Sequence, residues 1–214
     1  ALDFIASFKF ALPPFVTWTM EEWQTKNSEY DEIKENMLGW DITDFGSGDF
    51  HKCGLLMITL RNGNFHNPKY QKTYAEKLLI SEEGQVTPYH FHYKKMEDII
   101  NRGGSTLVVK CHTSGENGEM LDTPVTIYMD GRAFVVPAGQ RIEVGVGESI
   151  TLPTGQYHTF WAEGSPCLIG EVSKTNDDNV DNHFYEKVGR FPTIEEDEPK
   201  LYPLFSEYPN MPKK

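Results

Sequence analysis

The chain of 214 residues has few cysteines and lacks the apolar stretches that mark membrane and secreted proteins. Its three cysteines, Cys53, Cys111 and Cys167, show no CxxC spacing, which fits reduced, buried thiols rather than a disulfide framework. No apolar run reaches the roughly 20 residues of a membrane-spanning helix. The first residues also lack the basic and apolar regions of a signal peptide. We therefore expect a cytoplasmic protein with no membrane partner.

Basic charge is also scarce. Lysine and arginine total 20 residues against 32 aspartates and glutamates, which gives a formal net charge of −12. Nucleic acids and anionic membranes need a basic surface, so we expect neither as a partner. The same balance weighs against a highly phosphorylated substrate. Hydrophobic and aromatic contents of 38% and 13% are typical of a globular chain. Because no linker divides the sequence, we expect a single domain over residues 1–214.

The chain does contain many short strand-like runs separated by turns rich in glycine. These runs fall at residues 55–60, 74–80, 85–92, 105–112, 124–130, 132–136, 140–144, 148–152, 156–163 and 167–173. Asp130-Gly131, between two of them, predicts a β-hairpin. Many short strands without intervening helices predict an all-β antiparallel sandwich or barrel.

The two ends of the chain have different patterns. A threonine cap followed by acidic residues predicts a helix near residues 18–36, within an N-terminal extension that covers residues 1–50. Residues 174–214 are polar and then proline-rich. We expect this last segment to form an irregular cap and tail over the barrel of residues 74–173.

Two motifs place histidines where a metal ion needs them. His90 and His92 stand one residue apart in a strand-like run, so their side chains point to the same face. Glu97 just beyond that run, and His158 from a facing strand, would complete a mixed nitrogen and oxygen site that suits a divalent first-row metal. The alternative is a metal-free barrel in which these histidines are ordinary core or surface residues. The histidines without such spacing, which we expect to be structural or exposed, are His51, His66, His112 and His183.

Both motifs resemble those of the cupin family, whose fold is a jelly-roll β-barrel. The first family motif, G-x5-H-x-H-x(3,4)-E-x6-G, is matched by Gly84, His90, His92, Glu97 and Gly104. The second, G-x5-P-x-G-x2-H-x3-N, is matched by Gly147, Pro153, Gly155 and His158, with Ala162 where asparagine is usual. The resemblance covers about residues 74–173. It implies that His90, His92, Glu97 and His158 are the metal ligands.

Two charged residues near these motifs are candidates for catalysis. Lys95 lies between the expected ligands His92 and Glu97, where it could move a proton or hold a substrate oxygen, although a solvated lysine like Lys94 would look the same. Glu171 lies in the apolar run 167–173. A carboxylate there is a candidate general base if it faces inward and an ordinary solvated group if it faces outward.

Four other residues are candidates for substrate binding. Asp178 and Asp181 belong to a polar run that lacks the glycine and the final glutamate of a calcium-binding loop. Their carboxylates could bind sugar hydroxyls at the barrel mouth, or they could only cap turns. Phe160 and Trp161 flank His158 and could pack against a sugar ring, although barrel core is the simpler interpretation.

A narrower resemblance joins these features. The segments 87–104, 152–161 and 170–173, the polar run after them and the N-terminal extension resemble the D-lyxose isomerase family of cupins. The resemblance implies a homodimeric sugar isomerase that interconverts D-lyxose and D-xylulose, and often D-mannose and D-fructose. It also implies a divalent metal, most often Mn²⁺, although Co²⁺, Fe²⁺, Ni²⁺ or Zn²⁺ would suit the same ligands.

The mechanism expected from these residues is proton transfer through a cis-enediol. Glu171 would carry the proton between C2 and C1, and Lys95 would move protons between the sugar oxygens or stabilise the enediolate. A metal-mediated hydride shift is the rival route. A cupin iron dioxygenase with the same ligands, and a non-catalytic cupin that binds metal and sugar, remain alternative functions.

Overall fold

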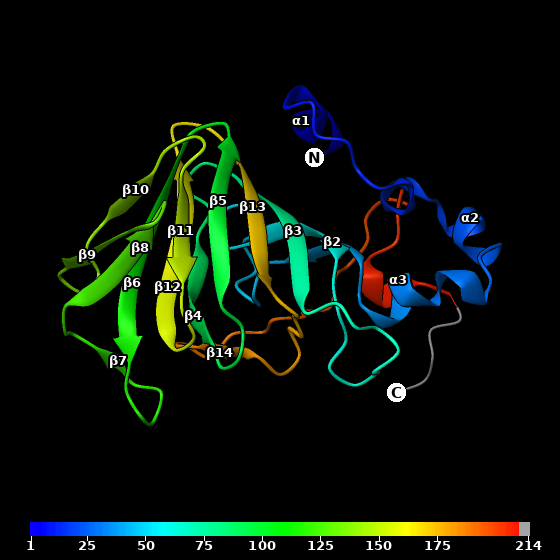
Figure 1. Ribbon diagram of the computed structural model, residues 1–214. Coiled ribbons are helices and arrows are strands. Elements are labelled where there is room, and N and C mark those ends of the chain that lie inside the picture. The colour runs from blue at the N-terminus through cyan, green and yellow to red at the C-terminus, as the bar shows by residue number, and fades with distance from the viewer. Residues whose placement is uncertain (210–214) are drawn as a thin grey trace.

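The computed structural model describes residues 1–209, and residues 210–214, the end of the predicted tail, lie outside the described part (Figure 1). The strands are β1 (Gly39–Thr43), β2 (Leu55–Arg61), β3 (Tyr74–Ser81), β4 (Thr87–His92), β5 (Glu97–Gly103), β6 (Thr106–Ser114), β7 (Met120–Leu121), β8 (Val125–Met129), β9 (Arg132–Val136), β10 (Ile142–Val144), β11 (Ser149–Leu152), β12 (Gln156–Glu163), β13 (Cys167–Lys174) and β14 (Asn182–Phe184). The helical segments are α1 (Leu2–Ser7), η1 (Pro14–Thr17), α2 (Met20–Gln24), η2 (Ser28–Tyr30), α3 (Asp31–Glu35) and η3 (Phe205–Glu207). Within residues 1–209, no helix has the length and apolar character needed to span a bilayer.

The strands form two curled antiparallel sheets. One has the strand order β1-β2-β3-β13-β5-β11-β8-β9, and the other has the order β10-β6-β12-β4-β14, with β7 paired to β6. Figure 1 shows the sheets curving around a common interior on the left of the view. Leu79 and Ile99 from one sheet and Phe160 from the other belong to the apolar core between them. The predicted all-β cupin-type barrel is confirmed.

The β8–β9 hairpin shows how the local sequence sets side-chain direction. Residues along β8 alternate between buried and exposed from Val125 to Met129, as expected for a strand with one face on the core. Asp130 and Gly131 then take φ angles of 47° and 78° and turn the chain into β9. Two successive positive φ angles are typical of a type I′ turn, which Asp-Gly favours. The predicted hairpin is confirmed.

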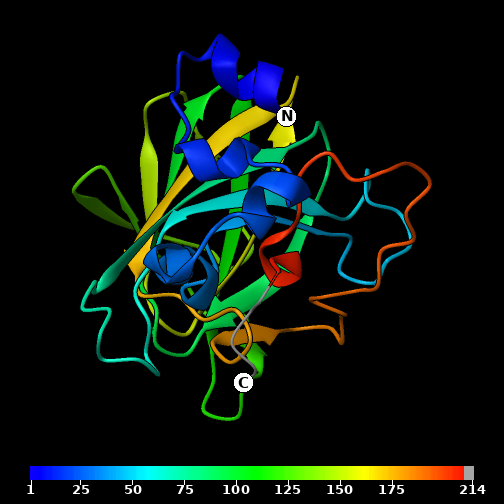
Figure 2. The same cartoon turned by 90° about the vertical axis from the view of Figure 1, so that its right-hand side faces the viewer.

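A second apolar core covers the outer face of the eight-stranded sheet. Ile58 and Leu78 of that face pack with Trp23 from the N-terminal extension and Tyr208 from the C-terminal segment. The Trp23 and Tyr208 rings stack with centroids 4.0 Å apart. Figure 2 shows the N-terminal helices and the C-terminal η3 in front of this sheet. Both ends of the chain therefore pack on one side of the barrel and leave its interior to the site.

The prediction of a single helix near residues 18–36 is wrong. In its place the structure has α2, then Thr25, Lys26 and Asn27 outside any helix, and then η2 followed directly by α3. The predicted threonine cap exists, since Thr19 and Glu22 form a capping box at the start of α2. Asn27 is extended, with φ −88°, and its side chain accepts a hydrogen bond from the Glu29 amide. Local bonds of this kind compete with continued helix, and here they end it.

Candidate functional site

The three histidines of the two motifs come from neighbouring strands of one sheet. His90 on β4 lies directly opposite His158 on β12, and His92 follows two residues later on the same face. Glu97 begins β5 in the other sheet. The expectation that His158 comes from a facing strand is therefore wrong, because the group from the facing sheet is Glu97.

The four side chains converge on one point inside the barrel. One ligand atom from each lies within 4.8 Å of the others. Glu97 Oε1 is 3.3 Å from His92 Nε2 and 3.2 Å from His158 Nε2. His90 and His158 each direct Nδ1 at a backbone carbonyl, at 2.8 and 3.0 Å. A carbonyl can only accept, so Nδ1 carries the hydrogen in both rings and each Nε2 is free to bind a metal.

Burial and charge give these side chains the protonation states that metal binding needs. Burial, together with His158 and His92, holds the pKa of His90 well below its usual range. Burial and Lys95 lower the pKa of His92. Burial opposes ionisation of Glu97, but the charge of the Lys95 ammonium group outweighs it and holds the pKa of that carboxyl well below its usual range. His90 and His92 are therefore neutral and Glu97 is charged, as metal ligands must be.

The cluster also contains buried nitrogens that lack hydrogen bonds. His92 Nε2 and His158 Nε2 have no hydrogen-bond partner among residues 1–209. Buried polar atoms in this condition destabilise a fold unless a ligand satisfies them. Imidazole nitrogens and one carboxylate suit a divalent first-row metal. The four residues fit such an ion, and no second cluster of this kind occurs in residues 1–209.

Lys95 and Glu171 both lie inside the barrel beside this cluster. Their exposed fractions are 1% and 4%. Lys95 Nζ is 2.6 Å from Glu97 Oε2 and 2.8 Å from Glu171 Oε1. Burial opposes the charge on Lys95, but Glu171 and Glu97 outweigh it and raise the pKa of the ammonium group. Lys95 therefore links the metal cluster to Glu171 as a charged group.

Further charged side chains continue from Glu171, and of these only Asp178 is a candidate from the sequence motifs. Lys77 Nζ lies 3.6 Å from Glu171 Oε1 and 3.4 Å from Asp178 Oδ2. Arg190 Nη2 then lies 3.0 Å from Asp178 and 2.6 Å from Asp41. A row of alternating charges thus runs away from the cluster. The pattern of β3 could have identified Lys77, since Ala75, Lys77 and Leu79 share its inward face, but Arg190 lies outside any strand and carries no such signal.

A narrow cavity connects these groups. It encloses about 420 Å³ including its open mouth. His90, His92 and Glu97 line it, together with Lys95, Glu171 and Lys77. Such a cavity, with convergent charged groups on its wall, can hold a small polar molecule against the metal cluster.

The structure places two of the four candidate substrate-binding residues at the cavity and two away from it. Asp178 and Phe160 line the cavity, whereas Trp161 and Asp181 do not. Trp161 follows Phe160 on β12, so strand alternation turns its ring to the outer face, where its Nε1 donates to Glu163 at 2.8 Å. This position does not support a substrate-binding role for Trp161.

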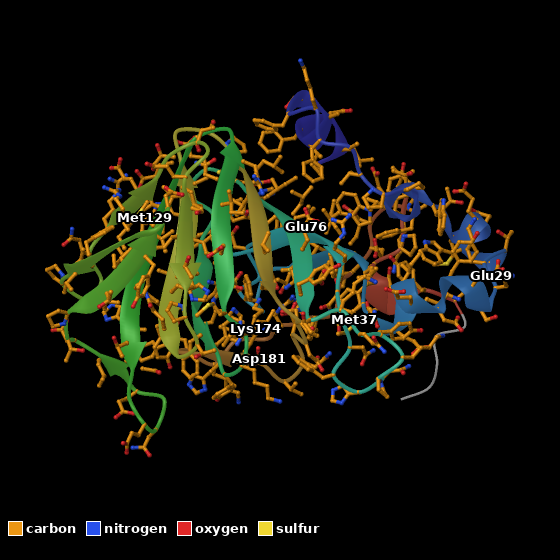
Figure 3. The ribbon with its side chains drawn as sticks, in the orientation of Figure 1. Glu29, Met37, Glu76, Met129, Lys174 and Asp181 are labelled. Carbon is orange, nitrogen blue, oxygen red and sulfur yellow. The ribbon has the colours of Figure 1, made fainter. Side chains whose placement is uncertain are left out.

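Asp181 is held in the structure by the backbone. Its two carboxylate oxygens accept hydrogen bonds from the amides of Lys94 and Lys95, at 2.8 and 3.0 Å. Figure 3 labels Asp181 and Lys174 at the same end of the barrel, beside this turn. Asp181 therefore fixes the turn that carries Lys95, and it is buried outside the cavity.

The other histidines lie outside the cluster. His51 is exposed and pairs with Glu82, and His66 contacts Asp177. His112 Nδ1 lies 3.1 Å from the Leu121 carbonyl, and His183 stacks on Phe91. Their structural or exposed positions are those that the sequence predicts.

Comparison with known proteins assigns the chain to a family. The family model described as D-lyxose isomerase matches residues 1–208. The chain is 42% identical over 209 residues to the D-lyxose/D-mannose isomerase of Escherichia coli O157:H7, covering 96% of this chain and 92% of the relative. It is 44% identical over 208 residues to the D-lyxose/D-mannose isomerase of Serratia proteamaculans, covering 96% and 91%.

A solved structure shares the fold. The L-ribose isomerase of Cellulomonas parahominis, solved with L-psicose, superposes with a TM-score of 0.56 at 14% identity, covering 90% of this chain and 92% of that one. The protein is a sugar isomerase. The chain belongs to the D-lyxose isomerase family.

Proposed function

We propose that the protein is a divalent-metal-dependent isomerase that interconverts free aldoses and ketoses. The substrate pairs are D-lyxose with D-xylulose and D-mannose with D-fructose, and its relatives are named for the two aldoses. The observation that carries the proposal is the contact of Lys95 with both Glu97 of the cluster and Glu171, at 2.6 and 2.8 Å. It joins the residues for metal binding to those for proton transfer in one cavity.

His90, His92, Glu97 and His158 would hold the metal. An ion bound there supplies Lewis-acid polarisation of the sugar carbonyl. We propose Mn²⁺, because a carboxylate beside imidazoles suits a harder ion, although Co²⁺, Fe²⁺, Ni²⁺ and Zn²⁺ accept the same donors.

Glu171 transfers the proton between the sugar carbons. Its carboxylate takes the proton from C2 of the aldose and returns it to C1, through a cis-enediol. Three side chains hold Oε1, and no described residue donates a hydrogen bond to Oε2, so Oε2 is the oxygen that meets the substrate. A positioned carboxylate is a suitable general base for this step.

Lys95 transfers the protons that the two sugar oxygens exchange. The hydroxyl on C2 must lose a proton as the oxygen on C1 gains one. Lys95 donates to the oxygen on C1 and recovers a proton from the oxygen on C2, so that the ammonium group is regenerated. Its burial against two carboxylates keeps the donor at one place in the cavity.

We further propose that the protein is a cytoplasmic homodimer. Free thiols support the compartment, since Cys53, Cys111 and Cys167 form no disulfide. Exposed apolar side chains on the β8–β9 hairpin, at the edge of the eight-stranded sheet, support association of two copies, among them Tyr128 and Val135 at 43% and 66% exposed. Light scattering should give about twice the chain mass of 24.5 kDa.

A panel of free aldoses, incubated with Mn²⁺ and assayed for ketose, tests the function. We expect D-lyxose and D-mannose to give ketose without oxygen uptake. Absence of ketose from every aldose would reject the isomerase. Oxygen uptake by the iron-loaded protein would favour a dioxygenase, and metal and sugar binding without turnover would favour a binding protein.

A second measurement separates the two isomerisation routes. Turnover in D₂O should place solvent deuterium on C1 of the ketose, because the proton on Glu171 can exchange with solvent. A hydride shift would leave C1 free of deuterium.

A further inference from the structure

Three lysine side chains are buried in residues 1–209, and one of them has no charged partner there. Lys34, Lys77 and Lys95 are 2%, 2% and 1% exposed. Lys77 and Lys95 each lie between two carboxylates. The Lys34 ammonium group forms neither an ion pair nor a hydrogen bond with any of residues 1–209. A cation that is withdrawn from water without a counter-charge destabilises a fold unless a ligand supplies one.

Lys34 lines a pocket on the outside of the barrel. Four parts of the chain meet there: α3, the loop after β2, the polar run before β14 and the segment after β14 that contains η3. Figure 1 shows η3, in red, beside α3. The pocket encloses about 1110 Å³ including its open mouth, and its described lining residues are all different from those of the cavity at the metal cluster. It is therefore a separate place at which a small molecule can bind.

Several other polar side chains of this pocket have partners within the protein. Asn67 Nδ2 donates to the Glu35 carboxylate at 2.7 Å. His66 Nε2 lies 3.1 Å from Asp177 Oδ2, and Asn179 Nδ2 donates to the other oxygen of the same carboxylate at 3.0 Å. These contacts hold the loop after β2 against α3 and the polar run. They give the pocket a fixed wall beside the unpaired ammonium group.

Two aromatic rings form an apolar part of the pocket wall. Phe191 and Phe205 meet edge to face, with ring centroids 6.3 Å apart. Phe191 is 46% exposed, although the Arg190 guanidinium group lies 4.4 Å from its centroid. Exposed aromatic surface packs well against an apolar or planar body. Together with Lys34, these rings indicate a ligand that has an anionic group at one end and such a body at the other.

The charges around the pocket decide which kind of anion fits. Lys34 offers a single point charge, and no arginine is among the described lining residues to grip a phosphate with two nitrogens. The Glu35 carboxylate also lines the pocket and repels a second negative charge. A monoanionic carboxylate matches one ammonium group, whereas a phosphate dianion does not.

We propose that this pocket binds a small organic carboxylate, whose anionic group pairs with Lys34 and whose body packs against Phe191 and Phe205. The proposal does not depend on the isomerase function, because the pocket is separate from the metal cluster. It explains why Lys34 is buried without a carboxylate of residues 1–209 beside it, unlike Lys77 and Lys95.

Titration calorimetry on the full chain with Mn²⁺ bound tests the proposal. Benzoate is the probe, and benzamide is a neutral control of the same shape. A hydrogen bond from a charged donor is worth about tenfold to a hundredfold, so benzoate should bind to wild type at least about tenfold more tightly than benzamide. Lys34→Met, which removes the charge and keeps the chain length, should lose this difference. Lys187→Met, at an exposed lysine outside the pocket, should keep it.

Equal binding of benzoate and benzamide to wild type would overturn the proposal, and this comparison needs no variant, so a folding defect in Lys34→Met leaves the test decisive. Benzoate binding that persists unchanged in Lys34→Met would place the anion elsewhere, such as at the metal cluster, and would also overturn it. Phenyl phosphate carries the same ring on a dianion and should bind more weakly than benzoate. Tighter binding of phenyl phosphate would contradict the assignment to a carboxylate.

Discussion

Glu171 is held through one of its two carboxylate oxygens. Lys95, Ser173 and Lys77 approach Oε1 at 2.8, 3.2 and 3.6 Å. An anchored oxygen beside a free one is the arrangement that a proton-transfer group needs, because the free oxygen keeps its direction without being blocked. At the scale of single residues, the proposed chemistry depends on this carboxylate and on the ammonium group of Lys95.

Replacing Glu171 by Gln should lower kcat for D-lyxose by about a hundredfold to ten-thousandfold, since the amide cannot accept the proton. The side-chain shape is retained, so metal content should stay at one ion per chain. Glu116→Gln, on an exposed turn, is the control and should match wild type. Turnover within a factor of about three of wild type would remove Glu171 from the mechanism.

Lys95 can be compared with its neighbour. Lys95→Ala should lower kcat about a hundredfold or more. It should also destabilise the metal-free protein by about 3–5 kcal/mol, because Glu97 and Glu171 lose their buried partner. Lys94→Ala removes an exposed side chain and should change neither quantity. Steady-state rates and thermal melts of both variants check this, and similar effects of the two substitutions would contradict it.

Sequence patterns predict some residues of the site and miss others. The spacing of His90 and His92 is local, so strand geometry alone indicates that they share a face. The alternation that places Phe160 and Trp161 on opposite faces of β12 is also local, so the sequence already indicates that only one of the two rings can face the cavity. Arg190 reaches the cavity because segments far apart in the sequence come together at Asp178 and Asp41. No short sequence motif predicts these contacts.

At the scale of elements, the turn between β4 and β5 positions the site. Lys95 and the start of β5 at Glu97 both depend on how this turn is held. Asp181, from the segment before β14, accepts two backbone amides of the turn. A residue in the polar run near the end of the chain therefore sets the direction of a side chain that lies 86 positions earlier.

Asp181→Asn should loosen that turn. The amide offers one acceptor oxygen in place of two, so one buried backbone donor loses its partner, at a cost of about 1–3 kcal/mol. Because Glu97 follows the turn, affinity for Mn²⁺ should fall by about tenfold to a hundredfold. Thermal melts and metal titration measure both effects. Unchanged metal affinity in a destabilised variant would show that the turn does not position Glu97.

Element prediction succeeded where one face of a strand is buried. The runs 132–136 and 156–163 match β9 and β12 to the residue, and β8 and β9 form the expected hairpin. The pattern missed β1, β5, β7 and β14. Residues along β5 include Asp98, Asn101 and Arg102, whose polarity hides a strand that neighbours cover on both sides. The expected helix failed because side-chain caps at Asn27 interrupted it.

At the scale of the whole molecule, alternating charges connect the metal cluster with the outer strands of one sheet. Each of Lys77, Asp178 and Arg190 is buried between groups of opposite sign. Burial opposes ionisation of Asp178, but Lys77 and Arg190 outweigh it and hold the pKa of that carboxyl well below its usual value of 3.8. Asp178 therefore stays ionised between its two cationic partners above its usual pKa.

Asp178→Asn should destabilise the protein by about 3 kcal/mol, since Lys77 and Arg190 lose a shared carboxylate. A depressed folded-state pKa gives stability that is fully present above the unfolded value and is lost only as pH falls through the folded one. The difference in Tm from wild type should thus be the same at pH 8 and pH 5. Calorimetry at both pH values checks this, and a difference that shrinks by half at pH 5 would contradict it.

The central claim is that the His90, His92, Glu97 and His158 cluster supports aldose–ketose isomerisation through a bound divalent ion. The most direct test is ketose formation from D-lyxose by chelator-stripped protein, titrated with Mn²⁺ while bound metal is measured. We predict negligible D-xylulose from the stripped protein and full recovery at one ion per chain. Undiminished ketose formation by protein free of metal would contradict the claim.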